Sequence, residues 1–165
     1  MSIISTDLEF IYMTAQTLRN NQKGFTLIEL LVVIGILAVL LAIVLIAINP
    51  AKQFSQANNT KRRSDVNAIL NAIDQYAADN HGTLPTGITA TSQEIAKTSV
   101  DICAALVTKY LAALPVDPLT SNGTPVTDCT STYITNYWVV KSTSDNRVTV
   151  NAPAAELTEI ISVTR

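Results

Sequence analysis

The sequence predicts an α+β protein in which a long N-terminal helix packs on a small antiparallel β-sheet. Residues 30–48 read LLVVIGILAVLLAIVLIAI and contain no charged or hydrogen-bonding side chain. The polar stretch that follows repeats apolar residues at the spacing of one helical face. Three short runs near the C-terminus are rich in aromatic and β-branched residues, which is typical of strands. Helix against sheet is a layer arrangement of the α+β class.

The apolar run predicts a membrane-spanning helix over residues 25–50. A helix rises about 1.5 Å per residue, so about 20 apolar residues cross the hydrocarbon core of a bilayer. A single segment in lipid must satisfy its backbone hydrogen bonds internally, which leaves the helix as the viable form. Gly35 and Pro50 are candidate points of flexibility, because glycine weakens a helix and proline kinks or starts one.

Residues 51–82 predict an amphipathic helix that ends near His81. Its apolar face is formed by Val66, Ile69, Leu70, Ile73, Tyr76 and Ala77. The other faces are expected to carry the charged and amide residues Lys61, Arg62, Asp65, Asn67, Asn71, Asp74 and Gln75. Phe25 to Asn80 is therefore expected to form one helix of about 84 Å, with or without a kink at Pro50.

Residues 83–165 predict a globular region that contains the sheet. We expect a loop over residues 83–98 and a short helix over Asp101–Ala113. The expected strands are Tyr133–Lys141, Arg147–Val150 and Ile160–Val163. The sheet is the expected partner of the apolar face of the amphipathic helix.

Composition and motifs argue against several functional classes. The net charge of −2 is unlike that of a dedicated nucleic-acid binder, which is usually strongly basic. The sequence has no G-x-S-x-G, H-E-x-x-H, P-loop or dinucleotide fingerprint, so we expect neither an enzyme nor a cofactor. His81 is expected to cap the helix end or to be solvated.

The two cysteines, Cys103 and Cys129, are expected to form a disulfide, because neither lies near another metal-ligand type at binding spacing. The bond would close a loop of about 27 residues and contribute about 3.5 kcal/mol in the chain-entropy model. It implies an oxidising compartment outside the cytoplasm. Two reduced thiols are the alternative.

Glu29 distinguishes the apolar segment from a plain membrane anchor. A carboxylate at depth in a bilayer costs a few kcal/mol and usually has a partner. Lys23 lies six residues upstream, whereas helix neighbours are three or four residues apart. A free amine created by cutting the chain before Phe25 would be a better partner, in the same chain or in an adjacent copy.

The segment Lys23–Val33, KGFTLIELLVV, resembles the prepilin signature of type IV pilins and the pseudopilins of type II secretion. Both share a basic leader, a glycine, a phenylalanine, a glutamate four residues later and a long apolar helix. The resemblance is strong over residues 19–50. It implies that residues 1–24 are a leader, and that prepilin peptidase cuts between Gly24 and Phe25 and methylates the new amine on Phe25.

The resemblance also implies the ladle-shaped pilin fold and a helical filament of identical subunits. Glu29 would pair with the Phe25 amine of a neighbouring subunit and set the register, because a misplaced copy would leave Glu29 buried and unpaired. Assembly ATPases and an inner-membrane platform would be partners, and the chain would reside in the membrane before assembly.

The start site and the topology each leave an alternative open. A leader from Met1 to Gly24 is long for this class, and Met13 is a second candidate start. The family places the N-terminus in the cytoplasm and the C-terminus outside, which agrees with a disulfide. A bare count of basic residues favours the opposite: Arg19 and Lys23 precede the span, and Lys52, Lys61, Arg62 and Arg63 follow it.

Two weaker site hypotheses concern charged residues beyond the span. Lys61-Arg62-Arg63 could contact DNA phosphates or a neighbouring subunit, or be an ordinary solvated helix face. The loop around Asp117 loosely resembles the calcium loop of major pseudopilins, but its aspartates are sparse. Turn or solvated-loop roles are expected for Asp117, Asp128 and Asp145, and no metal is assigned.

The leading functional hypothesis is a structural subunit of a type IV pilus that serves adhesion, motility or DNA uptake at the cell surface. The first alternative is a pseudopilin of a type II secretion system. The second is an uncleaved, single-pass binding module anchored in the membrane.

Overall fold

The computed structural model describes residues 24–165. The elements in chain order are α2 Leu27–Ile48, α3 Pro50–Asp79, β1 Gln93–Ala96, α4 Cys103–Leu106, the 3₁₀ helix η1 Ser121–Gly123, β2 Ile134–Lys141, β3 Val148–Ala152 and β4 Ile161–Thr164. The chain divides into two compact units between Ala47 and Ile48. The hypotheses about the leader, the start at Met13, and Arg19 and Lys23 lie outside the described residues.

Asn49 separates α2 from α3 just before Pro50, the residue expected to kink a helix or to start one. Its backbone is left-handed, with φ 46° and ψ 80°, a conformation that asparagine tolerates better than most residues. The Asn49 side chain accepts a hydrogen bond from the backbone N–H of Lys52 at 3.3 Å and thereby caps α3. Pro50 takes the first position of α3, where its missing N–H leaves no hydrogen bond unmade.

Helix α2 has no buried side chain. The exposed fraction of its large apolar residues ranges from 48% at Val44 to 84% at Ile46. Within residues 24–165, α2 is the one helix long and apolar enough to cross a membrane. It runs without interruption through Gly35, and nothing in the described part of the chain occupies the space that a side chain would take there.

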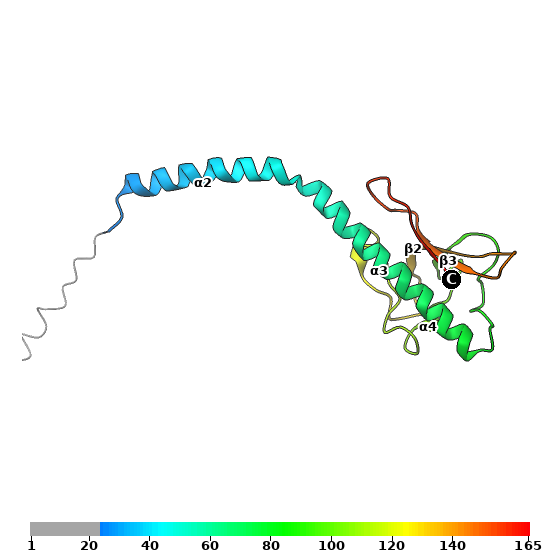
Figure 1. The fold of residues 1–165 in the computed structure, drawn as a ribbon. Coiled ribbons are helices and arrows are strands. Elements are labelled where there is room, and N and C mark those ends of the chain that lie inside the picture. Colours follow the sequence, from blue (N-terminus) through cyan, green and yellow to red (C-terminus); the bar gives the residue numbers. More distant parts are fainter. Residues whose placement is uncertain (1–23) are drawn as a thin grey trace, which may run out of the picture. The chain divides into compact units, whose positions relative to one another are not determined.

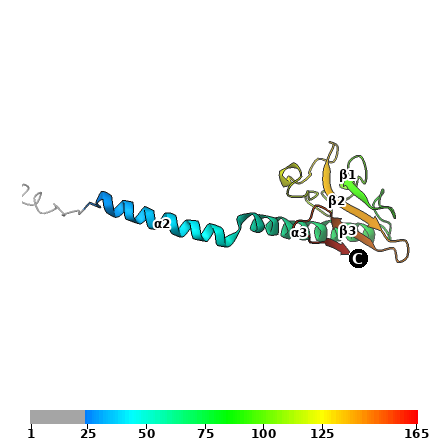
Figure 2. The same cartoon turned by 90° about the horizontal axis from the view of Figure 1, so that it is seen from above.

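In the second unit, α3 lies along a four-stranded antiparallel sheet of order β1-β2-β3-β4 (Figures 1 and 2). Val66, Ile69, Leu70 and Ile73 of α3 are fully buried, which confirms the predicted apolar face. Alternate residues of β2 and β3 face the same core: Thr135, Tyr137, Val139, Val148, Val150 and Ala152. The arrangement is α+β, as predicted.

The three predicted strands are present, and the sheet has a fourth. β1 lies inside residues 83–98, which were expected to form a loop. Its sequence, QEIA, is short and contains one β-branched residue, so composition does not reveal it. Pairing with β2 holds it: Ile95 is fully buried, and the hydroxyl of Thr135 donates to the Ile95 carbonyl at 2.7 Å.

The helix expected over Asp101–Ala113 is limited to the four residues of α4. Val107 is extended at φ −69° and ψ 142°, and Thr108 is left-handed at φ 73°. The Thr108 N–H then donates to the Leu111 carbonyl at 2.7 Å. Two β-branched residues in succession favour this departure from the helix.

Candidate functional site

Thr26 and Glu29 form a capping box at the start of α2. The backbone N–H of Thr26 donates to Glu29 Oε2 at 2.8 Å, and the Thr26 hydroxyl donates to the same oxygen at 2.7 Å. The backbone N–H of Glu29 in turn donates to the Thr26 hydroxyl oxygen at 3.3 Å. These bonds satisfy backbone donors that every helix start leaves unpaired. Sequence reasoning missed the role of Thr26, although the T-x-x-E pattern before an apolar run signals it.

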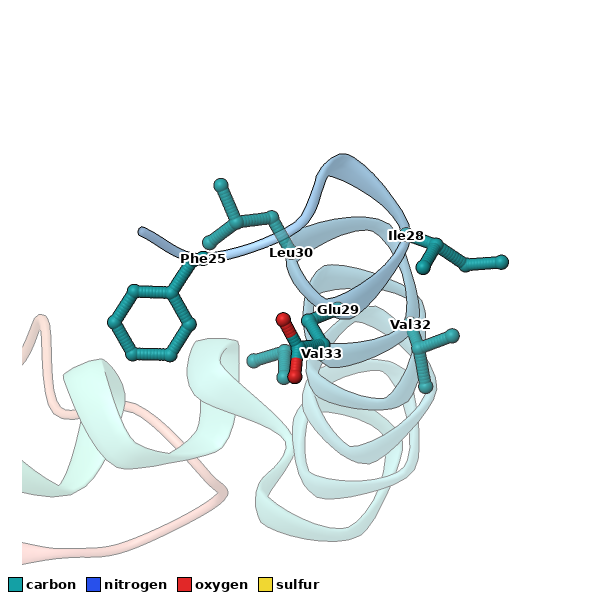
Figure 3. A pocket seen from close by; sticks show the side chains of 6 residues that line it. All are labelled: Phe25, Ile28, Glu29, Leu30, Val32 and Val33. Atoms are coloured by element: carbon teal, nitrogen blue, oxygen red, sulfur yellow. The ribbon is translucent and has the colours of Figure 1, made fainter. Parts of the chain in front are cut away.

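Glu29 keeps one oxygen available for another group. Both hydrogen bonds from Thr26 end on Oε2, and within residues 24–165 no group donates to Oε1. The carboxylate borders an apolar groove lined by Phe25, Ile28, Glu29, Leu30, Val32 and Val33. Figure 3 shows Glu29 and Val33 on one side of the helix, and Ile28 and Val32 on another. A lone carboxylate thus lies in an otherwise apolar surface.

The bond between Gly24 and Phe25 lies just before α2. Residues 24–26 have no regular secondary structure, and the helix begins at Leu27. Phe25 is 83% exposed, and among the described residues beyond its chain neighbours no atom lies within 4 Å of the place where a side chain on Gly24 would begin. Within residues 24–165, neither side chains from elsewhere in the chain nor helical hydrogen bonds therefore shield this peptide bond.

Arg62 is not on an exposed helix face, so that expectation for the basic run is wrong. Its guanidinium is fully buried: Nε donates to Asp117 Oδ2 at 2.7 Å and Nη2 donates to Asp117 Oδ1 at 3.1 Å. Nη1 donates to Glu156 Oε2 at 2.8 Å and to Asn59 Oδ1 at 3.0 Å. The carboxylate of Asp117 raises the pKa of Arg62 above its ordinary value. Arg62 is unavailable to DNA because its donors are used inside the protein.

Lys61 and Arg63 flank Arg62 and remain partly exposed. Lys61 Nζ pairs with Asp65 at 2.9 Å, and Arg63 pairs with Glu159. These pairs neutralise both charges within the chain. The hypothesis that the basic run contacts DNA or a neighbouring subunit therefore depends on Lys61 and Arg63 alone.

Glu156 fixes the loop between β3 and β4 onto α3. Its carboxylate accepts from Ser55 Oγ and Asn58 Nδ2, each at 2.9 Å, in addition to Arg62. Its backbone N–H donates to Asn59 Oδ1 at 2.9 Å, and its carbonyl accepts from Asn59 Nδ2 at 2.8 Å. The hydrogen bond from Arg62, followed by those from Asn58 and Ser55, lowers the pKa of Glu156.

Asp65 and Tyr137 form a buried hydrogen bond between α3 and β2. The buried hydroxyl of Tyr137 donates to Asp65 Oδ2 at 2.8 Å, and Lys61 pairs with the same carboxylate. Burial and the hydrogen bond to Asp65 raise the pKa of Tyr137. Asp65 is 6% exposed, contrary to the expectation that it lies on an outer face.

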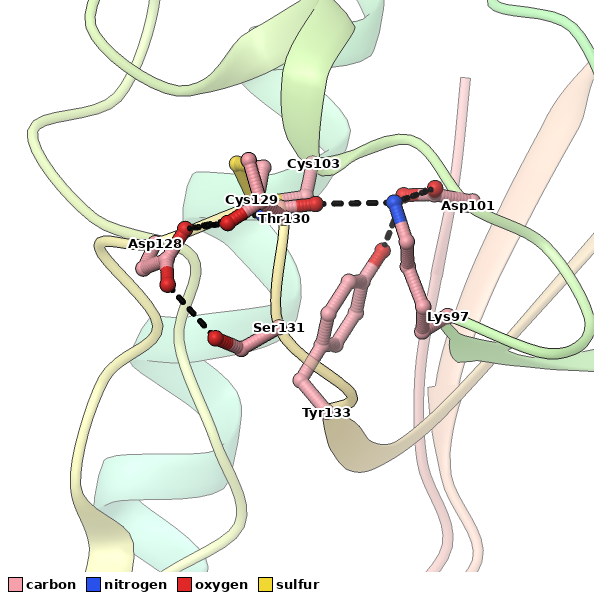
Figure 4. Close-up of a disulfide and its surroundings, with 8 residues drawn as sticks. All are labelled: Lys97, Asp101, Cys103, Asp128, Cys129, Thr130, Ser131 and Tyr133. Carbon is pink, nitrogen blue, oxygen red and sulfur yellow. Dashed lines mark hydrogen bonds and ion pairs between the residues drawn. A yellow bond between two sulfur atoms is a disulfide. The ribbon is translucent and has the colours of Figure 1, made fainter.

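Cys103 and Cys129 form a disulfide, with their Cα atoms 5.4 Å apart, which confirms the predicted bond. Figure 4 shows Lys97 beside it: Nζ contacts Asp101 at 2.7 Å and the Cys129 carbonyl at 2.8 Å. The Tyr133 hydroxyl donates to Asp101 at 2.7 Å. Burial alone would raise the pKa of Asp101, but Lys97 and Tyr133 outweigh it and the pKa is lowered. The disulfide thus joins α4 to a hydrogen-bonded loop.

The three loop aspartates differ in their surroundings. Asp117 is fully buried against Arg62 and therefore not solvated, but it has the expected turn role, because its carboxylate accepts from the backbone N–H of Leu119. Asp128 accepts hydrogen bonds from Ser131 and Thr130, which lower its pKa to about 2. Asp145 accepts from the backbone N–H of Arg147 at 3.2 Å. Within residues 24–165 there is no group of three His, Cys, Asp or Glu side chains placed to hold a metal ion.

Comparison with known proteins matches the N-terminal region to a family model described as the prokaryotic N-terminal methylation motif, over residues 19–45. Type II secretion system core protein G of Escherichia coli K12 is 36% identical over 101 residues, 60% of this chain and 68% of the relative. The protein of the same name from Klebsiella michiganensis is 35% identical over 102 residues, 61% of this chain and 70% of the relative. That from Pseudomonas aeruginosa is 42% identical over 62 residues, 38% of this chain and 42% of the relative. No solved structure was found to match.

Proposed function

The chain belongs to the family of type IV pilins and type II secretion pseudopilins, and we propose that it is a pseudopilin, a structural subunit of a type II secretion filament. The observation that carries the proposal is α2: an apolar helix with no buried side chain, whose first turn holds one carboxylate. Such a surface is unstable in water and must be covered by lipid or by other helices. The relatives, each named a type II secretion system core protein G, favour the pseudopilin over the type IV pilus subunit.

The first step proposed is cleavage between Gly24 and Phe25 by prepilin peptidase, followed by methylation of the Phe25 amine. The absence of helical hydrogen bonds at this peptide bond in the described chain supports access by a peptidase. Cleavage creates a positive charge next to the apolar segment. That charge is the partner that Glu29 lacks in the described part of the uncut chain.

Glu29 is proposed to receive the Phe25 amine of a neighbouring subunit on Oε1, to which no group of residues 24–165 donates, while Thr26 continues to hold Oε2. An ion pair in an apolar interior is favourable only if both partners are in place, so a subunit in the wrong register would leave two buried charges unpaired. Filament growth would then proceed by a head-to-tail contact that does not close on itself.

The proposed location follows from α2 and the disulfide. Before assembly the chain would span the inner membrane once, with the second unit in the oxidising compartment outside the cytoplasm. The assembly platform and its ATPase would be partners. Protection of the second unit from protease in intact cells, and its loss after opening the outer membrane, would test this orientation.

N-terminal sequencing of the mature chain tests the proposal against a plain anchor. We expect Phe25, methylated, at the N-terminus. An intact leader on all copies would exclude both the pseudopilin and the type IV pilus subunit.

Electron microscopy of filaments from cells that overproduce Glu29→Ala or Glu29→Gln tests the register contact, with Val33→Ala as a control on the same side of the helix. Normal filaments from the two Glu29 variants would overturn the role of Glu29.

A secretion assay separates the pseudopilin from the type IV pilus subunit. Deletion of the gene is expected to leave secreted proteins in the periplasm while twitching motility and DNA uptake continue. Loss of motility with normal secretion would instead support the pilus.

A further inference from the structure

We infer that a second copy of this chain docks on an apolar patch at the beginning of α3, which we call the Ile160 patch. It consists of Phe54 on α3 and of Leu157 and Ile160 on the loop between β3 and β4. The inference deepens the proposed function, on which it rests, by assigning a subunit contact outside α2.

The three side chains are exposed although they are large and apolar. The exposed fraction is 72% for Phe54, 41% for Leu157 and 94% for Ile160. The hydrogen bonds of Glu156 to Ser55 and Asn58 place the loop on the helical turn that carries Phe54. Two segments that are about 100 positions apart in the sequence thereby lie next to each other.

The loop that carries Leu157 and Ile160 is held in an unusual conformation. Leu157 and Thr158 are both left-handed, with φ 59° and 57°, which is unfavourable for residues other than glycine. Contacts on both sides maintain it: Asn59 bonds to the backbone of Glu156 and to the carboxylate of Glu159. The apolar side chains are therefore presented by a preorganised loop, which reduces the entropy lost on binding.

Two observations favour another copy of this chain as the occupant over lipid. Phe54 follows Ile48, the last residue of α2, by six residues, so at most about 22 Å of chain separates them. In the proposed filament, copies that cover the end of α2 are thus within reach of the patch. Charged residues lie next to it: Glu156 and Glu159 directly precede Leu157 and Ile160 in the chain, and Glu159 pairs with Arg63. An apolar centre with a polar rim is typical of protein interfaces, whereas acyl chains would leave these charges unsolvated.

Site-specific photo-crosslinking of the full chain in cells tests the contact directly. A photo-reactive phenylalanine analogue replaces Ile160, and the same analogue replaces Ala78 as the control. Ala78 is exposed on α3, 24 residues from Phe54, or about 36 Å along the helix. We expect a crosslinked dimer of this chain from position 160 and at least tenfold less from position 78. Crosslinks only to lipid or to an unrelated protein, or no dimer from position 160, would overturn the inference.

Charge substitutions measure the contribution of the patch to assembly. Ile160→Asp is expected to lower the number of filaments about tenfold or more, because it loses the burial of one large side chain at every contact. Ile160→Val and Ala78→Asp should assemble like the parent chain. N-terminal sequencing of each variant separates the two proposals. Normal filaments built from cleaved Ile160→Asp chains would contradict the contact at the Ile160 patch and leave the proposed function unaffected. An uncleaved parent chain that forms no filaments would contradict the proposed function. The crosslinks from position 160 would then still show whether two copies of the chain meet at the Ile160 patch.

Discussion

Arg62 and Asp117 form an ion pair in which both side chains are fully buried, with Nε and Oδ2 2.7 Å apart. Arg62 lies in the middle of α3, whereas Asp117 lies in the segment between α4 and η1. The backbone N–H of Leu119 also donates to Asp117 at 2.9 Å, so the carboxylate organises its own loop as well. One guanidinium thus joins α3 to this loop and, through Glu156, to the loop between β3 and β4.

Arg62→Met is expected to destabilise the second unit by about 3–5 kcal/mol. The substitution leaves Asp117 buried without its counter-charge, which is the costly way to break a buried pair. Urea unfolding of the full chain in detergent, followed by the fluorescence of the single tryptophan, Trp138, measures the change.

Two further variants make that prediction specific. Arg63→Met removes an arginine that is 52% exposed and should cost less than about 1 kcal/mol. Arg62→Met combined with Asp117→Asn should cost less than the sum of the single changes, because no fully buried charge is then left unpaired. Additive losses would show that Arg62 acts through packing and not through Asp117.

The N-terminal half of the candidate site could be predicted because its signals are local. Gly24, Phe25 and Glu29 lie in one short segment, so their spacing can be read directly from the sequence. The position of Arg62 could not be predicted in this way. Its partners, Asp117 and Glu156, lie 55 and 94 residues away, and helical periodicity marks only apolar residues as inward-facing.

The same limit explains the errors in the fold. β2 and β3 contain their own β-branched and aromatic residues, so composition locates them. β1 becomes a strand because β2 offers it hydrogen bonds, and α4 ends early because Val107 and Leu111 pair as a bridge. The break at Asn49 is different, because its signals are local: Asn49 caps α3 and Pro50 takes the first helical position, where a kink or helix start was expected. Tertiary context thus decided each element whose sequence was ambiguous.

Removal of the disulfide by Cys103→Ala with Cys129→Ala is expected to lower the free energy of unfolding by about 3.5 kcal/mol. The bond joins residues 26 positions apart and restricts the unfolded chain. Urea unfolding with and without a reducing agent measures this. The reducing agent should destabilise the parent chain and leave the double variant unchanged. Equal sensitivity of the two proteins would contradict the prediction.

Tyr137→Phe is expected to weaken the second unit at neutral pH and to reduce its sensitivity to alkali. The hydroxyl donates to a buried carboxylate, Asp65, and a hydrogen bond to a charged group contributes about 1.5–3 kcal/mol. The folded state raises the pKa of Tyr137 above its ordinary value of 10.0. Its contribution is therefore complete below about pH 10 and is lost as the pH rises further, since the unfolded chain ionises first.

Unfolding midpoints between pH 7 and pH 11.5 test both parts of the Tyr137 prediction. The parent chain should lose stability above pH 10 more steeply than Tyr137→Phe. Tyr110→Phe is the control, because that hydroxyl contacts the exposed Asp79. Parallel pH profiles for the parent chain and Tyr137→Phe would show that the buried hydroxyl does not carry the alkaline dependence.

Thr26→Val is expected to loosen the first turn of α2 while Thr26→Ser preserves it. Valine matches threonine in shape but removes the hydroxyl that accepts from the Glu29 N–H at 3.3 Å and donates to the Glu29 carboxylate. Loss of an N-cap costs about 1 kcal/mol, so the Glu29 amide should exchange with deuterium about fivefold faster. Site-resolved exchange on the full chain in detergent measures this, with the Val39 amide in the helix interior as an internal reference. Unchanged exchange at Glu29 in the valine variant would mean that the carboxylate, and not Thr26, holds the start of the helix.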